Sequence, residues 1–254
     1  GVLAVQIQLL RIVEMPPRER GLHQPRQDRV HSDAMRGELY RDFADPVGMA
    51  GRTLVEGLFG IQPDALKNTL TIQPGLPQSW NHASIEIPDV SFAFERKNNT
   101  DSYQITPHFA TKMNLHLLVN ASHESIQKLT VNGKDGNWKC IESTIGNPKI
   151  SIEVPYAESY QIEIIWSGDT LDNPAYDSNI CEGEKCTIKT IKAQILTIKD
   201  SQNIVSITKQ TSHQFDAFIN GLGNKTLFIK LRQGDMIWWQ AIDLTIQPKL
   251  EIVS

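Results

Sequence analysis

Residues 56–80 read EGLFGIQPDALKNTLTIQPGLPQSW, and the hydrophobic pattern changes its period in the middle of this stretch. Upstream of it, apolar residues recur at helical spacing. Asp45 is a favourable N-cap, Pro46 a favourable first helical residue, and Gly60 can end the helix in a left-handed conformation. The sequence therefore predicts a helix from Asp45 to Phe59.

After Pro63 the apolar residues alternate with polar ones, which is typical of strands with one buried face. Turn residues separate these segments: Pro74, Gly75 and Pro77 end one strand, and Asn132–Gly133 favours a tight hairpin. About eight short strands at regular spacing predict an antiparallel β-sandwich. The alternating pairs and triplets that carry this prediction are Leu70 and Ile72, Ile85 and Ile87, Val90, Phe92 and Phe94, Leu115, Leu117 and Val119, Ile150, Ile152 and Val154, and Tyr160, Ile162, Ile164 and Trp166.

A second change in composition follows the last of these strands. Residues 168–185 are acidic and poor in apolar residues, so we expect a linker, and strand patterns then resume to the end of the chain. The predicted fold class is mainly β: an antiparallel sandwich followed by a second, smaller β-domain, with a short N-terminal helical remnant. The predicted units are an irregular segment and helix at 1–62, a sandwich at 63–167, a linker at 168–185 and a second β-domain at 186–254.

Charge and hydropathy exclude two classes of partner. The net charge is −4 among 254 residues, which gives no general electrostatic reason to bind nucleic acid. No apolar run approaches the roughly 20 residues that span a bilayer. Residues 15–33 are rich in arginine and proline, and two interpretations stay open: an arginine-rich binding arm, or an irregular linker or truncated edge. The sequence begins at Gly1 rather than Met, which predicts a processed product or an excised fragment.

Residues 36–95 carry a resemblance to a known architecture. They combine a last helix, a GLFGIQPD corner, an LTIQPGLPQSW strand and turn, and a following edge strand. This combination resembles the exit from a six-hairpin (α/α) barrel into its C-terminal β-sandwich. Glycosidases and glycoside phosphorylases have that architecture, and the sequence is most similar to glycosidase-like proteins of gut-bacterial polysaccharide utilisation. The resemblance is specific over these residues and only compositional after Pro107.

The resemblance implies that most of a catalytic barrel, of some 300 residues or more in that family, is missing from this chain. It also implies that the loop before the helix would border the mouth of a complete barrel. That loop contains Glu38, Asp42 and Asp45. They are the candidate catalytic carboxylates, because glycoside hydrolysis uses two carboxyl groups that flank the scissile bond. The alternative is a capping or solvated role, which suits Asp45 in particular.

Metal and cofactor motifs give no positive signal. The seven histidines form no HExxH and no paired Cys spacing, so we expect no metal site and no cofactor. Of the three cysteines, Cys181 and Cys186 bracket EGEK, and a small-loop disulfide between them is expected in an oxidising compartment. Cys140 would remain free, as a half-buried strand residue.

The tryptophans are the candidate carbohydrate-binding residues. Trp238 and Trp239 are adjacent in a predicted strand, so their side chains point to opposite faces and one must leave the core unless both faces are covered. An exposed tryptophan can stack on a sugar ring. Trp138 follows a turn and is expected to be half exposed. The alternative for each is packing, and Trp166 and Trp80 are expected in the core and at the junction.

Two functions remain open. One is an accessory C-terminal β-region of a carbohydrate-active, glycoside hydrolase-like protein, without catalysis of its own, whose partner is an upstream barrel. The other is a stand-alone carbohydrate-binding or cell-surface interaction module, whose partner is an oligosaccharide or polysaccharide. A product without activity is the third case. The resemblance implies a periplasmic or extracellular location, although the sequence shows no secretion signal.

Overall fold

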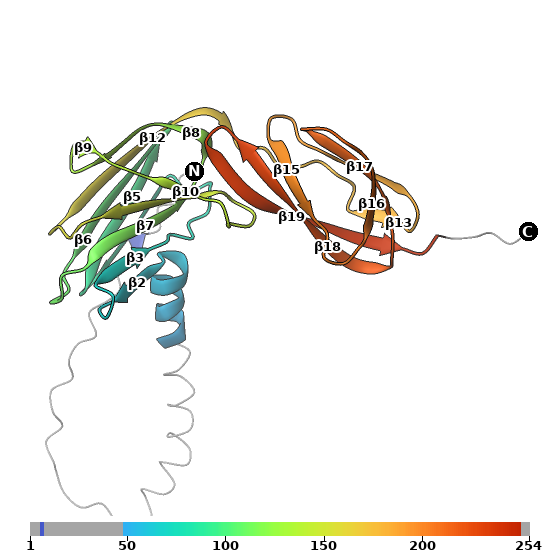
Figure 1. The fold of residues 1–254 in the computed structure, drawn as a ribbon. Helices are drawn as coiled ribbons and strands as arrows, with labels where there is room; N and C mark the ends of the chain where they lie inside the picture. The colour runs from blue at the N-terminus through green and yellow to red at the C-terminus, as the bar shows by residue number, and fades with distance from the viewer. Residues whose placement is uncertain (1–5, 8–47, 250–254) are drawn as a thin grey trace, which may run out of the picture.

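The structure is a computed structural model, and it describes residues 6–7 and 48–249. Strands dominate it, and they form four sheets (Figure 1). The predicted mainly-β fold class with a short helical segment is confirmed. The predicted carboxylates Glu38, Asp42 and Asp45 lie outside the described residues.

The helix begins, within the described residues, at Gly48 with α-helical turns and winds as a π-helix, η1, over Thr53–Leu58. The π-winding appears as a bond from the Phe59 N–H to the Leu54 carbonyl at 3.0 Å, five residues back. Arg52 and Glu56 pair on its surface at 2.8 Å, as their spacing of four predicts. Gly60 ends the helix at a φ of 64°, as expected.

The first pair of sheets forms the predicted sandwich. One sheet has the order β1-β4-β5-β6-β12-β8-β9 and the other β10-β11-β7-β3-β2. Most pairs are antiparallel, but β3 pairs with β7, and β1 with β4, in parallel. The strands are β1 (Gln6–Ile7), β2 (Ile61–Asp64), β3 (Thr69–Ile72), β4 (His82–Ile87), β5 (Val90–Lys97), β6 (Thr100–Pro107), β7 (Asn114–Asn120), β8 (His123–Val131), β9 (Lys134–Asp135), β10 (Lys139–Ile141), β11 (Lys149–Val154) and β12 (Tyr160–Thr170).

The second pair of sheets contains the later strands. One has the order β13-β19-β18-β15 and the other β14-β17-β16. Here too one neighbour is parallel, because β13 pairs with β19 in that direction. The strands are β13 (Asn179–Cys181), β14 (Lys185–Lys189), β15 (Gln194–Lys199), β16 (Val205–Gln210), β17 (Gln214–Ile219), β18 (Gly223–Gln233) and β19 (Met236–Gln247).

The segment that was predicted as a linker, 168–185, carries more structure than its composition suggests. β12 extends to Thr170, β13 lies within the segment, and β14 begins at its last residue. Backbone pairing with a distant strand accounts for β13, and local composition cannot reveal such a partner. The division of the chain into domains stays a prediction.

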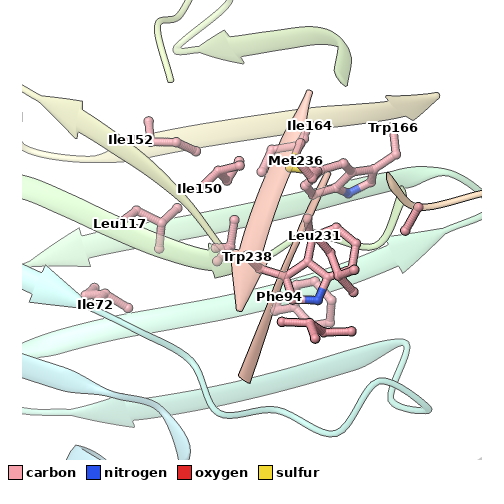
Figure 2. Packing of buried hydrophobic residues seen from close by; sticks show 14 of the residues in the cluster. Ile72, Phe94, Leu117, Ile150, Ile152, Ile164, Trp166, Leu231, Met236 and Trp238 are labelled. Atoms are coloured by element: carbon pink, nitrogen blue, oxygen red, sulfur yellow. The ribbon is translucent and has the colours of Figure 1, made fainter. Parts of the chain in front are cut away.

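The alternating residues of the sandwich strands face inward, as predicted, and the buried apolar residues form one continuous cluster. This cluster includes side chains of both sheet pairs. Figure 2 shows Leu231, Met236 and Trp238 from the β18–β19 ribbon beside Phe94, Ile164 and Trp166 of the sandwich. The ribbon therefore closes one end of the sandwich core.

Candidate functional site

The two adjacent tryptophans of β19 have different environments. Trp238 is 1% exposed and lies in the core between the ribbon and the sandwich (Figure 2). A sugar platform requires an exposed ring face, and protein covers both faces of this ring. Trp238 is thus a packing residue in this structure, in agreement with the alternative that the sequence left open.

Trp239 points to the outer face of the β13-β19-β18-β15 sheet and is half-buried. Its cross-strand partner is Lys230, and Phe228, two residues before Lys230, is its diagonal neighbour. Diagonal neighbours in an antiparallel pair lie about 7–8 Å apart, within reach of aromatic rings. Trp239 and Phe228 therefore form a short aromatic strip, which we call the outer strip.

The loop after β10 borders the outer strip. The Gly146 N–H donates to the Trp239 carbonyl and the Trp239 N–H to the Thr144 carbonyl, both at 2.8 Å. Lys230 pairs with Glu142 at 2.7 Å, and the lysine lowers the pKa of that carboxyl by hydrogen bonding and charge. These contacts hold the aromatic strip against the sandwich edge.

The other tryptophans pack. Trp138 is half-buried and packs against the core. Trp80 is half-buried and caps the turn that begins at Pro77, through a bond from its N–H to the Pro77 carbonyl at 3.0 Å. Trp166 is 2% exposed and donates its indole N–H to Asp101 Oδ2 at 2.9 Å. The expected core position of Trp166 is confirmed.

A cleft of ≈ 320 Å³ opens at the end of the sandwich where the β18–β19 ribbon meets it. Its size is at the lower end of the range of small-molecule sites, about 300–1,000 Å³. Three aromatic residues, Phe94, Tyr103 and Trp238, contribute to its lining. The turn residues that the sequence marks as a junction, Pro74 to Gln78, supply part of the wall. The rest comes from Arg96, Asn98 and the segments 119–123, 146–148 and 170–173.

An ion pair underlies the cleft. Asp101 is fully buried, and Arg96 binds it in a bidentate manner, with Nε to Oδ1 at 2.5 Å and Nη2 to Oδ2 at 2.7 Å. The guanidinium also lies 5.4 Å from the ring centroid of Phe94. The hydrogen bond and charge of Asp101 raise the pKa of Arg96. A buried carboxylate is costly unless a positive charge pairs with it, and Arg96 supplies that charge. The pair holds Arg96 beside the cleft, and its two charges cancel.

Two polar side chains of the cleft lining differ from the rest. The Asn120 carbonyl oxygen, Oδ1, is buried and has no hydrogen-bond partner among the described residues. The other is Tyr103, which carries a hydroxyl and is 4% exposed. Burial, and then the charge of Asp101, raise the pKa of Tyr103, so the hydroxyl remains protonated and can donate. Unpaired buried polar groups are uncommon and call for an explanation.

The acids of the described residues do not form a hydrolytic pair in the cleft. Asp172 is the one carboxylate in its lining, and Asp172 Oδ2 accepts the backbone N–H groups of Ile191 and Lys192 at 2.5 and 2.9 Å. Glycoside hydrolysis requires two carboxyl groups across the bound sugar. Among the described residues no group of three or more His, Cys, Asp or Glu side chains could hold a metal ion.

All three cysteines are free thiols in the structure. The predicted Cys181–Cys186 bridge is absent from it: Cys181 lies in β13 and Cys186 in β14, in different sheets. Burial raises the pKa of Cys186, with a further contribution from Asp177. Cys140 is half-buried in β10, as expected, and its sulfur accepts the Ile237 N–H at 3.2 Å.

Sequence reasoning missed the cleft. Its lining comes from segments that are far apart in the chain, from Pro74 to Trp238, and no local pattern connects Tyr103 with Asn120 or with Trp238. The only local signal was the proline-rich turn at Pro74–Pro77, whose apolar side chains line part of the cleft.

Comparisons with known proteins do not identify a family. No family model and no curated protein matches the chain. Among solved structures, a gamma-CGTase from alkalophilic Bacillus clarkii is similar at 9% identity and a TM-score of 0.21, over 65% of this chain and 25% of that one. The N-terminal periplasmic domain of ScsB from Proteus mirabilis is similar at 6% identity and a TM-score of 0.20, over 65% of this chain and 98% of that one. The chain thus spans about a quarter of the length of the gamma-CGTase.

In the part of the chain that the structure describes, every helix is too short or too polar to cross a membrane.

Proposed function

We propose that this chain is an accessory β-region of a carbohydrate-active, glycoside hydrolase-like protein, and that it does not hydrolyse glycosides on its own. The observation that carries the proposal is the position of the helix. Val55 and Leu58 pack against the sandwich core, whereas Met49, on another side of the helix, is 60% exposed. Apolar residues on two sides of a helix are typical of a helix that packs between two bodies.

The corner after the helix supports a fixed junction. The Gln73 N–H donates to the Gly60 carbonyl at 3.0 Å, and the Gly75 N–H donates to the Leu58 carbonyl at 2.9 Å. A Cβ on Gly60 would lie 1.9 Å from the Gln73 carbonyl oxygen, so the backbones touch. These contacts set the direction in which the helix leaves the sandwich. We propose that its outer side, with Met49, packs against a helical barrel of the kind that the sequence resembles.

The absence of turnover is proposed from the distribution of acids. Glu86, Glu153 and Glu163 stand singly on exposed positions of separate strands. Asp172 is the only carboxylate in the cleft lining of the described part, and backbone N–H groups engage it. Hydrolysis needs an acid and a second carboxylate held on opposite sides of the sugar.

The test is an assay of this chain with a panel of aryl glycosides and plant or host oligosaccharides. Wild type and the variants Glu38→Ala, Asp42→Ala and Asp45→Ala are compared, with Glu163→Ala as the control for loss of an exposed carboxylate. We expect no turnover by any of them. Turnover by wild type that one of the three loop variants loses, and the control keeps, would show that the chain carries its own active site.

A second candidate function is carbohydrate binding on the outer strip, and the exposure of Trp239 beside Phe228 favours it. Neighbouring aromatic rings on a sheet face can stack on successive sugar rings, with affinities on the order of millimolar. Affinity electrophoresis in gels that contain polysaccharide tests it. Trp239→Ala and Phe228→Ala are expected to abolish retardation, whereas Tyr156→Ala, which removes an aromatic residue that is 40% exposed on the sandwich, is expected to keep it.

A further inference from the structure

We infer that the cleft at the sandwich end binds a neutral, polyhydroxylated ligand, a short saccharide, through the Tyr103 hydroxyl and the Asn120 side-chain amide. This inference rests on the proposed carbohydrate role and assigns it a second site, distinct from the outer strip.

The first step is the position of the cleft. It lies where four separate segments of the sandwich side (74–78, 119–123, 146–148 and 170–173) meet the β18–β19 ribbon, with Trp238 contributing from β19. Clefts between structural units are common ligand sites, because side chains from several elements converge there. A volume of ≈ 320 Å³ suits a short saccharide rather than a long chain laid along the surface.

The second step is the charge of the lining. Asp101 neutralises Arg96 in a bidentate pair, and backbone N–H groups engage Asp172. His123 lies at the rim, where its Nδ1 is 3.0 Å from the Ser122 hydroxyl. No lysine lines the cleft within the described residues, and its one arginine is paired, so an anionic ligand would find no free counter-charge. The lining favours an uncharged ligand.

The third step is the type of polar group. The remaining polar lining consists of amides and hydroxyls, each able to donate and to accept, as sugar hydroxyls do. The three aromatic residues of the lining are buried and form part of the apolar wall of the cleft. The amide side chains of the lining are Gln78, Asn98, Asn120, Asn147 and Asn173, and its hydroxyl side chains are Tyr103, Ser122 and Thr170.

The fourth step is the position of two polar groups of the lining. Asn120 Oδ1 and the Tyr103 hydroxyl come from opposite sheets, β7 and β6, and both residues line the same cleft. Asn120 Oδ1 is buried and has no hydrogen-bond partner among the described residues, and an unpaired buried polar group costs stability. A ligand hydroxyl can donate to the amide oxygen, and another can accept from the phenol. The two groups thus act as the polar contacts that orient the sugar.

The experiment measures equilibrium binding of neutral sugars. Glucose, galactose, mannose, N-acetylglucosamine, maltose and cellobiose are titrated into the full chain, with glucuronate and galacturonate as anionic counterparts. Saturation-transfer NMR detects binding, and tryptophan fluorescence gives the dissociation constant, because Trp238 lines the site. We expect at least one neutral sugar to bind with a dissociation constant on the order of 1 mM, and the uronates to bind more weakly.

The variants separate this site from the outer strip. Tyr103→Phe removes only a hydroxyl, and Asn120→Ala removes the amide; each is expected to weaken binding about fivefold or more, the effect of one lost hydrogen bond. Their matched controls are Tyr156→Phe and Asn137→Ala, on exposed residues outside the cleft, which are expected to bind as wild type does. Asn147→Ala serves as a third cleft variant if one of the first two fails to fold.

Several results would overturn the inference: no binding of any neutral sugar, tighter binding of the uronates, unchanged binding in the folded cleft variants, or loss of binding in Trp239→Ala alone. The last outcome would move the site to the outer strip. Because this experiment measures affinity, its failure is distinguishable from failure of the proposed function, which glycoside turnover would reveal.

Discussion

The side chains of Trp238 and Trp239, adjacent in β19, lie on opposite faces of their sheet: Trp238 is 1% exposed in the core, and Trp239 is half-buried on the outer face. The buried ring connects the β18–β19 ribbon to the sandwich, where it lies near Phe94 (Figure 2). The sequence predicted the opposite orientation of the two rings, because the strand period is two, but it could not say which ring faced the core.

Trp238→Ala is expected to lower the free energy of unfolding by about 3–5 kcal/mol, the range for loss of a large core aromatic residue. Trp239→Ala is the matched control, and its expected loss is below about 1 kcal/mol because its ring is partly solvated. Urea unfolding followed by far-UV circular dichroism gives both values. Equal losses in the two variants would contradict the assignment of Trp238 to the core.

Gly60→Ala is expected to destabilise the chain by more than about 3 kcal/mol, since the new Cβ combines a left-handed backbone with a severe clash. Gly60 has a φ of 64°, and its Cβ would lie 1.9 Å from the Gln73 carbonyl oxygen. Gly133→Ala is the control: Gly133 has a φ of 76° but nothing within 4 Å of a Cβ, so only conformational strain of about 1 kcal/mol is expected. Thermal unfolding of both variants checks the difference, and a Gly60→Ala loss no larger than the control would mean that the corner can open.

The sequence predicted the fold well where the pattern is local. The alternation in β5, β7, β11 and β12 corresponds to inward-facing side chains, and Gly60 ends the helix as its residue type favours. Non-local pairing was less visible. The parallel neighbours β3 and β7 are separated in the chain by the three strands β4, β5 and β6, and β13 pairs with the end of β19, so their partners are far away in the chain.

The candidate site was less predictable than the fold. Burial of Trp238 depends on how the ribbon meets the sandwich, and the cleft depends on four separate segments. The apolar spacing of the sequence also did not predict that η1 is a π-helix, because that spacing is interpreted with 3.6 residues per turn. These features arise from tertiary packing, and a single sequence carries no local signal for them.

The bridge between Cys181 and Cys186 stays a prediction for oxidising conditions. Refolding in a glutathione redox buffer is expected to leave Cys140 as the one free thiol, while refolding with reductant leaves all three cysteines free, as in the structure. In the folded reduced protein, Cys186 is expected to react slowly with a thiol reagent, because burial raises its pKa and limits access. Thiol counting after denaturation, with Cys140→Ser as the control, checks the bridge. Three free thiols after oxidative refolding of wild type would exclude it.

Asp216 makes the stability of the second pair of sheets depend on pH in the acidic range, because stability falls when its carboxylate is protonated. Its side chain is 6% exposed and pairs with Lys185 at 2.9 Å, while Asp216 Oδ1 accepts the Gln214 amide at 2.8 Å and the Thr187 hydroxyl at 3.0 Å. These contacts, with the Lys185 hydrogen bond first, lower the pKa of Asp216 to about 2.

Because the pKa in the folded state is below the unfolded value of about 3.9, the stabilisation is fully present above that value and is lost as the pH falls toward 2. Unfolding by urea, measured at a series of pH values through this window, is expected to show a steeper loss of stability in wild type than in Asp216→Asn, which cannot titrate. Lys185→Met should raise the folded pKa of Asp216 and narrow the window, whereas Lys189→Met, on the same strand and at an exposed position, should leave the wild-type slope. Identical pH profiles for wild type and Asp216→Asn would show that the carboxylate is not held by these contacts in solution.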